Sequence, residues 1–172
     1  DLRQGNHGPE DYLRPFYVTH YNGQDLITPN SNPNRQTPSG YNQSNFMQKV
    51  FYRPNTQWNL SLAYHHSATS AYSRYDRQLR TKNDLPRYGQ WDYGPQKWAM
   101  KQFTANHTRA QGIFSEMTLR LAQQDFEESR ISRGFNDPIQ ENRSEAVVAY
   151  SANLDLRKSI GDKGELFYGL EW

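Results

Sequence analysis

The sequence predicts an all-β fold, an antiparallel up-and-down meander of about six strands. Apolar and polar residues alternate with a period of two in several segments, which is the pattern of strands whose two faces meet different surroundings. Short and long connections also alternate between those segments. In an antiparallel meander, this order places the tight turns at one end of the sheet and the long loops at the other.

Three segments show the alternation most clearly. In residues 58–72 the even positions, such as Leu60 and Leu62, are mainly apolar, whereas the odd positions are small or polar. Residues 144–159 and 165–172 repeat this pattern. Each of the three segments is therefore expected to form a strand with one apolar face.

The remaining strands are less distinct. Residues 41–53 alternate less cleanly, and residues 98–108 only weakly. Residues 113–130 alternate too, but they also place apolar residues four positions apart, as a helix would. We expect a strand at 113–130 because the segments on both sides are strands. A short extended piece is expected at residues 16–20, inside an otherwise irregular N-terminal region.

The connections indicate which kind of sheet this is. Short turns are expected at residues 53–57, 108–112 and 161–164, and long loops at residues 1–40, 76–97 and 134–142. One end with short turns and one with long loops, joined by strands of about 10 residues, is typical of outer-membrane β-barrels. The prediction is that residues 41–172 form part of a transmembrane β-barrel and that residues 1–40 belong to its extracellular loops.

The composition agrees with this interpretation. Only 34% of the residues are hydrophobic and the mean hydropathy is −1.07, yet 14% are aromatic. Disordered chains are poor in aromatic residues, whereas a membrane barrel combines an apolar outer stripe with a polar interior. The alternative is a soluble all-β module for carbohydrate binding or adhesion, because a sheet with one solvated face alternates in the same way.

Several classes of protein are not indicated. The chain has no cysteine and a net charge of +2 with acids and bases interspersed, so neither a disulfide framework nor a nucleic-acid partner is expected. No apolar run is long enough for a transmembrane helix. Because no nucleotide-binding motif and no Ser/His/acid constellation is present, we expect neither an enzyme nor a lipid-hydrolysing barrel, and no cofactor.

Two adjacent histidines, His65 and His66, raise the question of a metal site. Neighbouring residues on a strand point to opposite faces, so this pair cannot hold one ion together. By the alternation, His66 joins the apolar face and His65 the polar face. We expect no metal site.

Three stretches carry a resemblance to a known family: SGYNQSNFMQKVFYRP, WNLSLAYHHSATSAYSRYDR and NRSEAVVAYSANLDLRKSIGDKGELFYGLEW. In this order they resemble the barrel of a TonB-dependent outer-membrane receptor of the type common in Bacteroidetes, over residues 40–172. The resemblance implies the outer membrane of a Gram-negative bacterium and the import of a scarce nutrient such as a ferric siderophore, haem, cobalamin or a glycan. Its partners would be outer-membrane lipid, the nutrient, and TonB.

The family has a closed barrel of about 22 strands, an N-terminal plug and a TonB box. The six strands expected here cannot close a barrel, and neither plug nor TonB box is visible. The chain begins DLRQGNHG without a methionine and ends inside an apparent strand. We therefore expect a fragment of a longer receptor.

The candidate ligand-binding residues lie in the loop that follows the second strand, and they are Arg74, Tyr75, Arg87, Tyr88, Trp91 and Tyr93. Arginines at a barrel rim suit an anionic siderophore or a phosphate, although pairing of arginine and aspartate across neighbouring strands explains Arg74, Asp76 and Arg77 more readily. Aromatic rings suit sugars or aromatic chelates, although they are equally able to pack the loop on itself.

Overall fold

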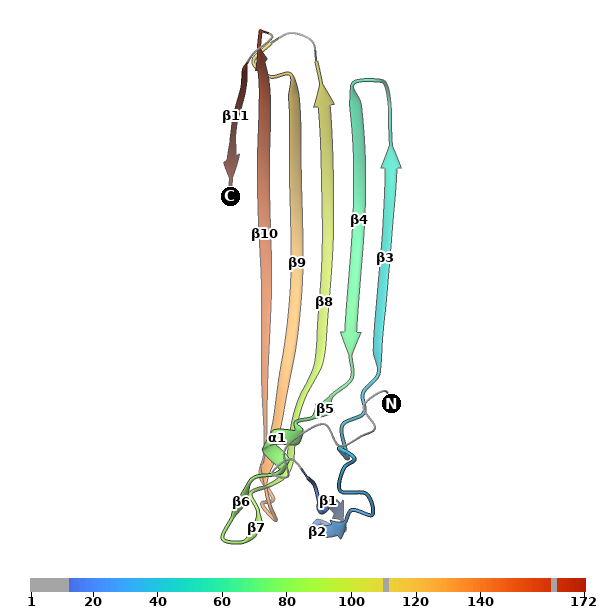
Figure 1. Ribbon diagram of the computed structural model, residues 1–172, viewed down its shortest axis with the longest axis vertical. Helices are drawn as coiled ribbons and strands as arrows, with labels where there is room; N and C mark the ends of the chain where they lie inside the picture. Colours follow the sequence, from blue (N-terminus) through green and yellow to red (C-terminus); the bar gives the residue numbers. More distant parts are fainter. Residues whose placement is uncertain (1–12, 110–111, 162–163) are drawn as a thin grey trace. The chain divides into compact units, whose positions relative to one another are not determined.

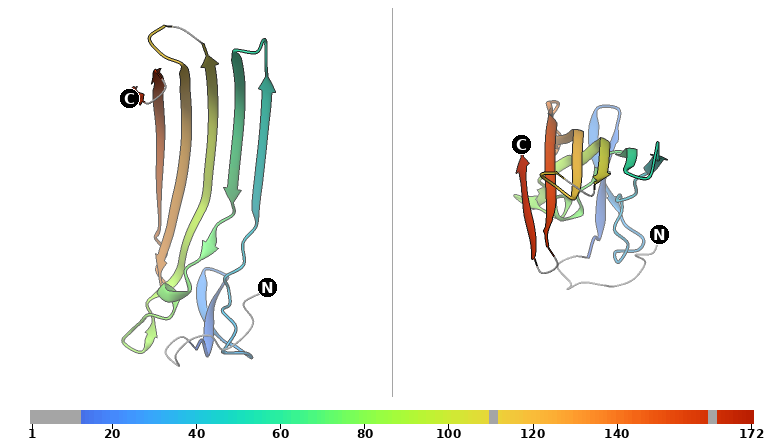
Figure 2. Two further views of the ribbon diagram at one scale, coloured as in Figure 1. Left: turned by 45° about the horizontal axis from the view of Figure 1, so that its top comes forward. Right: turned by 90° about the horizontal axis from the view of Figure 1, so that it is seen from above.

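The computed structural model describes residues 13–109, 112–161 and 164–172, and these residues form an antiparallel all-β fold. Six strands follow one another across the main sheet in sequence order (Figure 1): β3 (Gln43–Tyr52), β4 (Trp58–Thr69), β8 (Tyr88–Thr108), β9 (Glu116–Gly134), β10 (Gln140–Ile160) and β11 (Gly164–Glu171). The views of Figure 2 show the same order. The predicted antiparallel meander is confirmed, and so is a strand, rather than a helix, at 113–130.

Short elements complete the described fold. The hairpin of β1 (Phe16–Tyr21) and β2 (Gln24–Pro29) is a separate sheet, as are β6 (Thr81–Lys82) and β7 (Leu85–Pro86). The two-residue strand β5 (Tyr72–Ser73) pairs with β8, and α1 (Tyr75–Gln78) is a single helical turn. No helix in the described part of the chain is long and apolar enough to cross a membrane.

The β1–β2 hairpin replaces part of the irregular region expected at residues 1–40. Tyr21 pairs with Gln24 across a two-residue turn, and both turn residues, Asn22 and Gly23, have positive φ, 49° and 77°. This is the Asn-Gly turn that matches the twist of paired strands. The expected extended piece at 16–20 is confirmed, and the sequence also contained the signal for its partner strand.

The chain divides into two compact units, each assembled from three separate stretches. Unit 1 comprises Asp1–Gln43, Thr69–Gln96 and Glu127–Glu145, and unit 2 comprises Ser44–Ala68, Lys97–Phe126 and Ala146–Trp172. The predicted short turn at residues 53–57 joins β3 to β4 in unit 2, whereas the β4–β8 and β9–β10 connections belong to unit 1. The predicted turns at 108–112 and 161–164 include residues 110–111 and 162–163, which lie outside the described residues. The predicted domain boundary at residue 40 stays a prediction.

The long connections are shorter than expected. Strand β8 already begins at Tyr88, and only residues 135–139 separate β9 from β10. A long loop at 134–142 was therefore wrong, and with it the strict alternation of short and long connections. The reason is that the ends of these strands lack a continuous apolar stripe and include Gly94 and Pro95, which indicate a loop when only local sequence is considered.

In unit 2 the usual burial pattern of a strand is reversed. Ser61 and Ala63 of β4 are buried, with 8% and 6% of their surface exposed. The alternate residues Leu62 and Tyr64 are 58% and 37% exposed. Strand β4 has neighbours on both sides in the sheet, so this exposure is not that of a sheet edge. In this part of β4 the small side chains are buried and the large apolar side chains are exposed.

The β10–β11 pair of unit 2 separates the two chemistries in the same way. Leu154 lies opposite Leu170, and Leu156 opposite Tyr168. The other face of β10 carries Asp155, which pairs with Arg120 of β9. Arg157 pairs there with Glu116 and Glu165. The alternation predicted for residues 144–159 is confirmed as one apolar and one ionic face.

Candidate functional site

Unit 1 contains a group of arginines packed around two aromatic rings. The rings of Trp91 and Tyr93 meet edge to face at 5.1 Å, and Trp91 is only 8% exposed. The guanidinium of Arg74 lies 5.5 Å from the Trp91 ring centroid and 5.0 Å from that of Tyr93. Arg77 lies 5.3 Å from the Trp91 centroid, and Arg130 lies 5.9 Å and 5.3 Å from the two rings. We call these five residues the arginine–aromatic cluster.

Three elements bring the cluster together. Trp91 and Tyr93 are two positions apart on β8, so their side chains share a face. Arg130 comes from β9, the next strand of the sheet. Arg74 is positioned by its backbone N–H, which donates to the carbonyl of Trp91 at 2.9 Å, and this contact also fixes the start of α1.

The charges of the cluster are not balanced. Arg74 forms two hydrogen bonds of 2.6 Å to the carboxylate of Asp76, which raise the pKa of Arg74 and lower that of Asp76. Arg77 lies 3.8 Å from the same carboxylate. In Arg77 and Arg130, Nε is buried and has no hydrogen-bond partner among the described residues. Two of the three guanidinium groups, those of Arg74 and Arg77, thus lie against one carboxylate, whereas Arg130 lies over the rings.

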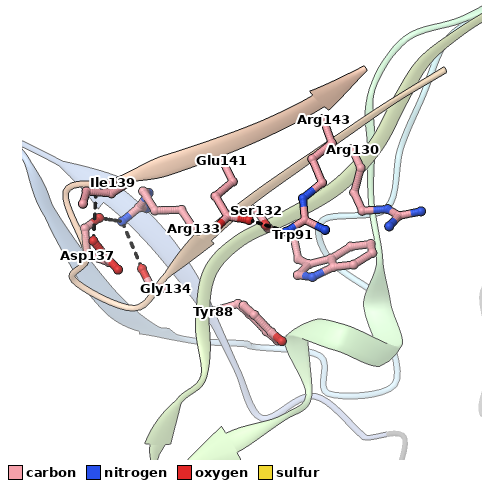
Figure 3. Close-up of a pocket in the computed structure, with 10 residues that line it drawn as sticks. All are labelled: Tyr88, Trp91, Arg130, Ser132, Arg133, Gly134, Asp137, Ile139, Glu141 and Arg143. Carbon is pink, nitrogen blue, oxygen red and sulfur yellow. Dashed lines mark hydrogen bonds and ion pairs between the residues drawn. The ribbon is translucent and has the colours of Figure 1, made fainter. Parts of the chain in front are cut away.

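A cavity of about 500 Å³ opens beside the cluster (Figure 3). Its wall carries the rings of Tyr88 and Trp91, the guanidinium groups of Arg130, Arg133 and Arg143, and the carboxylates of Asp137 and Glu141. Flat aromatic faces, hydrogen-bond donors and carboxylates around one space are a typical lining for a polar ligand with a flat or cyclic part.

The three arginines of the wall differ in how firmly they are held. Arg143 forms a 3.0 Å ion pair with Glu141, but both side chains are mostly exposed, at 68% and 58%. An exposed pair of this kind contributes only about 0–1 kcal/mol, so a ligand can displace it at little cost. In the described part of the chain, Arg130 contacts rings rather than a carboxylate. These two guanidinium groups are the ones available to an anionic group of a ligand.

Arg133, in contrast, is committed to a buried ion pair. Its Nη1 and Nη2 donate to the two carboxylate oxygens of Asp25 at 2.7 and 2.5 Å, and the Asp25 side chain is fully buried. His20 Nδ1 lies 2.8 Å from the same carboxylate. Burial by itself raises the pKa of Asp25, but hydrogen bonds from Arg133, from the Asn136 backbone and from His20 outweigh it and lower the pKa to about 2.

The same carboxylate organises the β9–β10 turn that borders the cavity. The N–H of Asn136 donates to Asp25 at 2.7 Å, and the N–H of Asp25 donates to the Asn136 side chain at 2.8 Å. Arg133 Nη1 also donates to the carbonyls of Gly134 and Asp137 (Figure 3). We call Asp25, Arg133, Asn136 and His20 the Asp25 node.

Gly89 makes room for this node. A Cβ at this position would lie 2.2 Å from a carboxylate oxygen of Asp25 and 2.7 Å from Nη2 of Arg133. No side chain other than hydrogen fits there unless the ion pair moves. The glycine of β8 is therefore part of the structure that supports the cavity.

The six predicted ligand-binding residues do not all line the cavity. Tyr88 and Trp91 line the cavity, whereas Arg74 and Tyr93 lie in the cluster beside it. Arg87 stacks over the ring of Tyr88 at 5.4 Å. Tyr75 lies in α1 beneath the guanidinium of Arg14, at 5.7 Å. Arg74 pairs with Asp76 two residues further on, rather than across strands, and the rings pack within unit 1. Ligand binding by these six residues stays a prediction.

Sequence reasoning did not find Asp25, Arg130, Arg133 or Arg143 as site residues. Asp25 and Arg133 are far apart in the chain, and the stretch around Arg133 and Arg143 was assigned to a loop. The one local signal was the Asn22-Gly23 turn, which places Asp25 at the start of a hairpin strand.

The histidines form no metal site in the described residues. His65 lies 6.0 Å from the ring of Trp98, and His107 stacks on Trp58 at 4.2 Å. No group of three His, Asp or Glu side chains in residues 13–109, 112–161 and 164–172 is arranged to hold a metal ion.

Comparisons of this chain with protein-family models, with curated proteins and with solved structures found no match.

Proposed function

We propose that this chain is a segment of a β-barrel in the outer membrane of a Gram-negative bacterium, and that the whole protein is a TonB-dependent transporter that imports a scarce nutrient. One observation carries the membrane part of this proposal. In the interior strand β4, Leu62 and Tyr64 are exposed while Ser61 and Ala63 are buried. A barrel in lipid directs its apolar side chains outward and its small and polar side chains inward.

The energetics favour lipid over water for this face. Burying one leucine side chain is worth about 1.5–3 kcal/mol, and unit 2 exposes many large apolar side chains besides Leu62, including Leu121 and Leu166. Among the described residues, only Ala63, Pro86, Trp91 and Ala105 have buried apolar side chains. Such a chain lacks the apolar core that stabilises a soluble domain, whereas lipid would cover its open face.

The nutrient-binding part of the proposal rests on unit 1. We assign ligand capture to the cavity of unit 1. The guanidinium groups of Arg130 and Arg143 favour a nutrient that carries anionic groups, and the rings of Tyr88 and Trp91 favour one with a flat or cyclic part. Energy coupling through TonB would reside in other parts of the transporter.

The membrane assignment is tested with two arginine substitutions on one strand of the full-length protein. Leu62→Arg places a charge on the open apolar face, at a cost of about 2–4 kcal/mol in the middle of a bilayer. His65→Arg, three residues further along β4, places the same charge on the other face. We expect Leu62→Arg to lower the amount of folded protein in outer-membrane fractions, measured by heat-modifiable gel mobility, and His65→Arg to leave it unchanged.

Equal effects of the two substitutions would contradict the membrane assignment. So would a full-length protein that stays monomeric in water without detergent, and that outcome would favour a soluble carbohydrate-binding or adhesion module with Tyr88 and Trp91 as its sugar platform. The nutrient half is tested separately with Arg130→Gln, which should reduce nutrient-dependent growth while the amount of protein in the membrane is unchanged.

A further inference from the structure

Unit 2 has its own cavity on the open apolar face. It has a volume of about 350 Å³ and is formed by β4, β8, β9, β10 and Trp172. Trp172 is held at its border by two backbone hydrogen bonds to Ala152, of 2.8 and 2.9 Å. We call this cavity the outer groove.

The lining of the outer groove has two chemically different parts. One part is apolar and consists of Leu62, Phe103, Leu121 and Ala152. The other part is amphipathic and contains Tyr150, Trp172, Gln123 and Lys101. Tyrosine and tryptophan side chains of this kind gather where hydrocarbon meets the headgroups of a membrane. The groove lining therefore has an apolar part that suits an acyl chain and a polar part that suits a headgroup.

Lys101 is the only charged side chain in the groove lining, and it is exposed. Among the described residues it has no hydrogen-bond or ion-pair partner. Other cations of unit 2 are matched on the ionic face, where Arg120 pairs with Asp155 and Arg157 with Glu116. An ammonium on a lipid-facing surface is unfavourable unless an anion accompanies it.

We propose that the outer groove binds one phospholipid with an anionic headgroup. Its acyl chain lies against Leu62, Phe103 and Leu121, and its phosphate accepts hydrogen bonds from the ammonium of Lys101. The carboxamide N–H₂ of Gln123 already donates to Asp125, at 3.2 Å, so Lys101 is the main phosphate donor of the groove. This inference rests on the proposed membrane location of unit 2.

The test uses tryptophan quenching by lipids with brominated acyl chains. The full-length protein is reconstituted into vesicles of phosphatidylcholine that contain increasing amounts of brominated phosphatidylglycerol, or of brominated phosphatidylcholine as the neutral reference. Trp172→Phe identifies the part of the quenching that arises at the groove. We expect this part to saturate at a lower mole fraction of the anionic lipid than of the neutral lipid.

The role of the charge is tested with Lys101→Gln, which should weaken the preference for the anionic lipid about tenfold, as expected for a hydrogen bond to a charged group. Lys101→Arg should retain it. Lys49→Gln is the matched control, because the ammonium of Lys49 lies over the ring of Phe51, away from the groove lining. Millimolar inorganic phosphate should leave the quenching unchanged.

Equal quenching by both lipids, or an unchanged preference in Lys101→Gln, would overturn the inference. Displacement by inorganic phosphate would also overturn it, because the site would then recognise a phosphate ion rather than a lipid. A protein that does not insert, and whose tryptophans no brominated lipid quenches, would instead overturn the proposed membrane function.

Discussion

The carboxylate of Asp25 and the guanidinium of Arg133 form a buried ion pair with two hydrogen bonds, of 2.5 and 2.7 Å. One residue comes from the β1–β2 hairpin and the other from the end of β9. With Asn136, this pair joins the hairpin to the β9–β10 turn that borders the cavity. The cavity of unit 1 therefore depends on a residue that does not line it.

Asp25→Asn should loosen this part of unit 1. The substitution leaves the charge of Arg133 buried without its counter-ion, and breaking one partner of a buried pair costs about 3–5 kcal/mol. We expect much faster hydrogen exchange at the backbone amides of β2 and of residues 134–139. His20→Gln is the control, because the His20 side chain is half exposed and its loss leaves the Asp25–Arg133 pair intact. Equal exchange in the two variants would show that the ion pair does not hold these segments.

Acid should produce the same loosening in the wild-type protein. The pKa of Asp25 is lowered from 3.8 to about 2 in the folded protein. The resulting stabilisation, roughly 2 kcal/mol, is fully present above about pH 4 and is lost as the pH falls through 2. We expect protection of the 134–139 amides to fall between pH 4 and pH 2. In Asp25→Asn the loss of protection between pH 4 and pH 2 should be smaller. A loss of the same size would show that other carboxylates cause it.

Gly89→Ala should disturb the same ion pair by steric overlap, without removing either charge. The new Cβ would lie 2.2 Å from an Asp25 oxygen, so either the carboxylate or β8 must move. We expect a loss of stability of about 1–3 kcal/mol, as for other overpacked sites, measured as increased proteolysis of the β9–β10 turn. Gly40→Ala is the matched control, since no atom lies within 4 Å of a Cβ placed there. Similar proteolysis of both variants would contradict the prediction.

Trp91→Leu should release α1 from the arginine–aromatic cluster. The indole ring contacts the guanidinium groups of Arg74, Arg77 and Arg130, and each such contact contributes about 0.5–2 kcal/mol. We expect the amides of residues 77–79, which are hydrogen-bonded within the turn, to lose protection from hydrogen exchange. Tyr88→Leu removes a ring of the same cavity that stacks with Arg87 instead. It should leave these amides protected, and equal loss in both variants would disprove a specific role of Trp91.

Much of the fold follows from short-range sequence features. The alternation in residues 58–72 predicted which face of β4 is apolar, and the short turns predicted the order of the strands. The helix alternative for residues 113–130 was excluded only by tertiary pairing, because β9 exchanges backbone hydrogen bonds with β8 and β10. The extension of β8 back to Tyr88 was missed for the same reason. Its glycines and proline favour a loop locally, but hydrogen bonds to neighbouring strands outweigh that preference.

The candidate site was less predictable than the strands. Tyr88 and Trp91 were found because aromatic residues in a polar loop are visible in the sequence, and both line the cavity. Arg130 and Arg143 were not found, because they become site residues only when β9 and β10 bring them to the same cavity.

The sequence by itself determined the all-β meander, the short turn at residues 53–57 and the two-faced character of its strands. These features depend on residues that are close in the sequence. Because successive side chains of a strand point to opposite faces, the order of the residues directly gives the face on which each one lies. Only the tertiary structure decided which side chains of β4 are buried, which arginines are committed to carboxylates, and that Asp25 and Gly89 support the cavity. Such contacts join residues far apart in the sequence, and burial and hydrogen bonding at those points arise only when the strands are brought together.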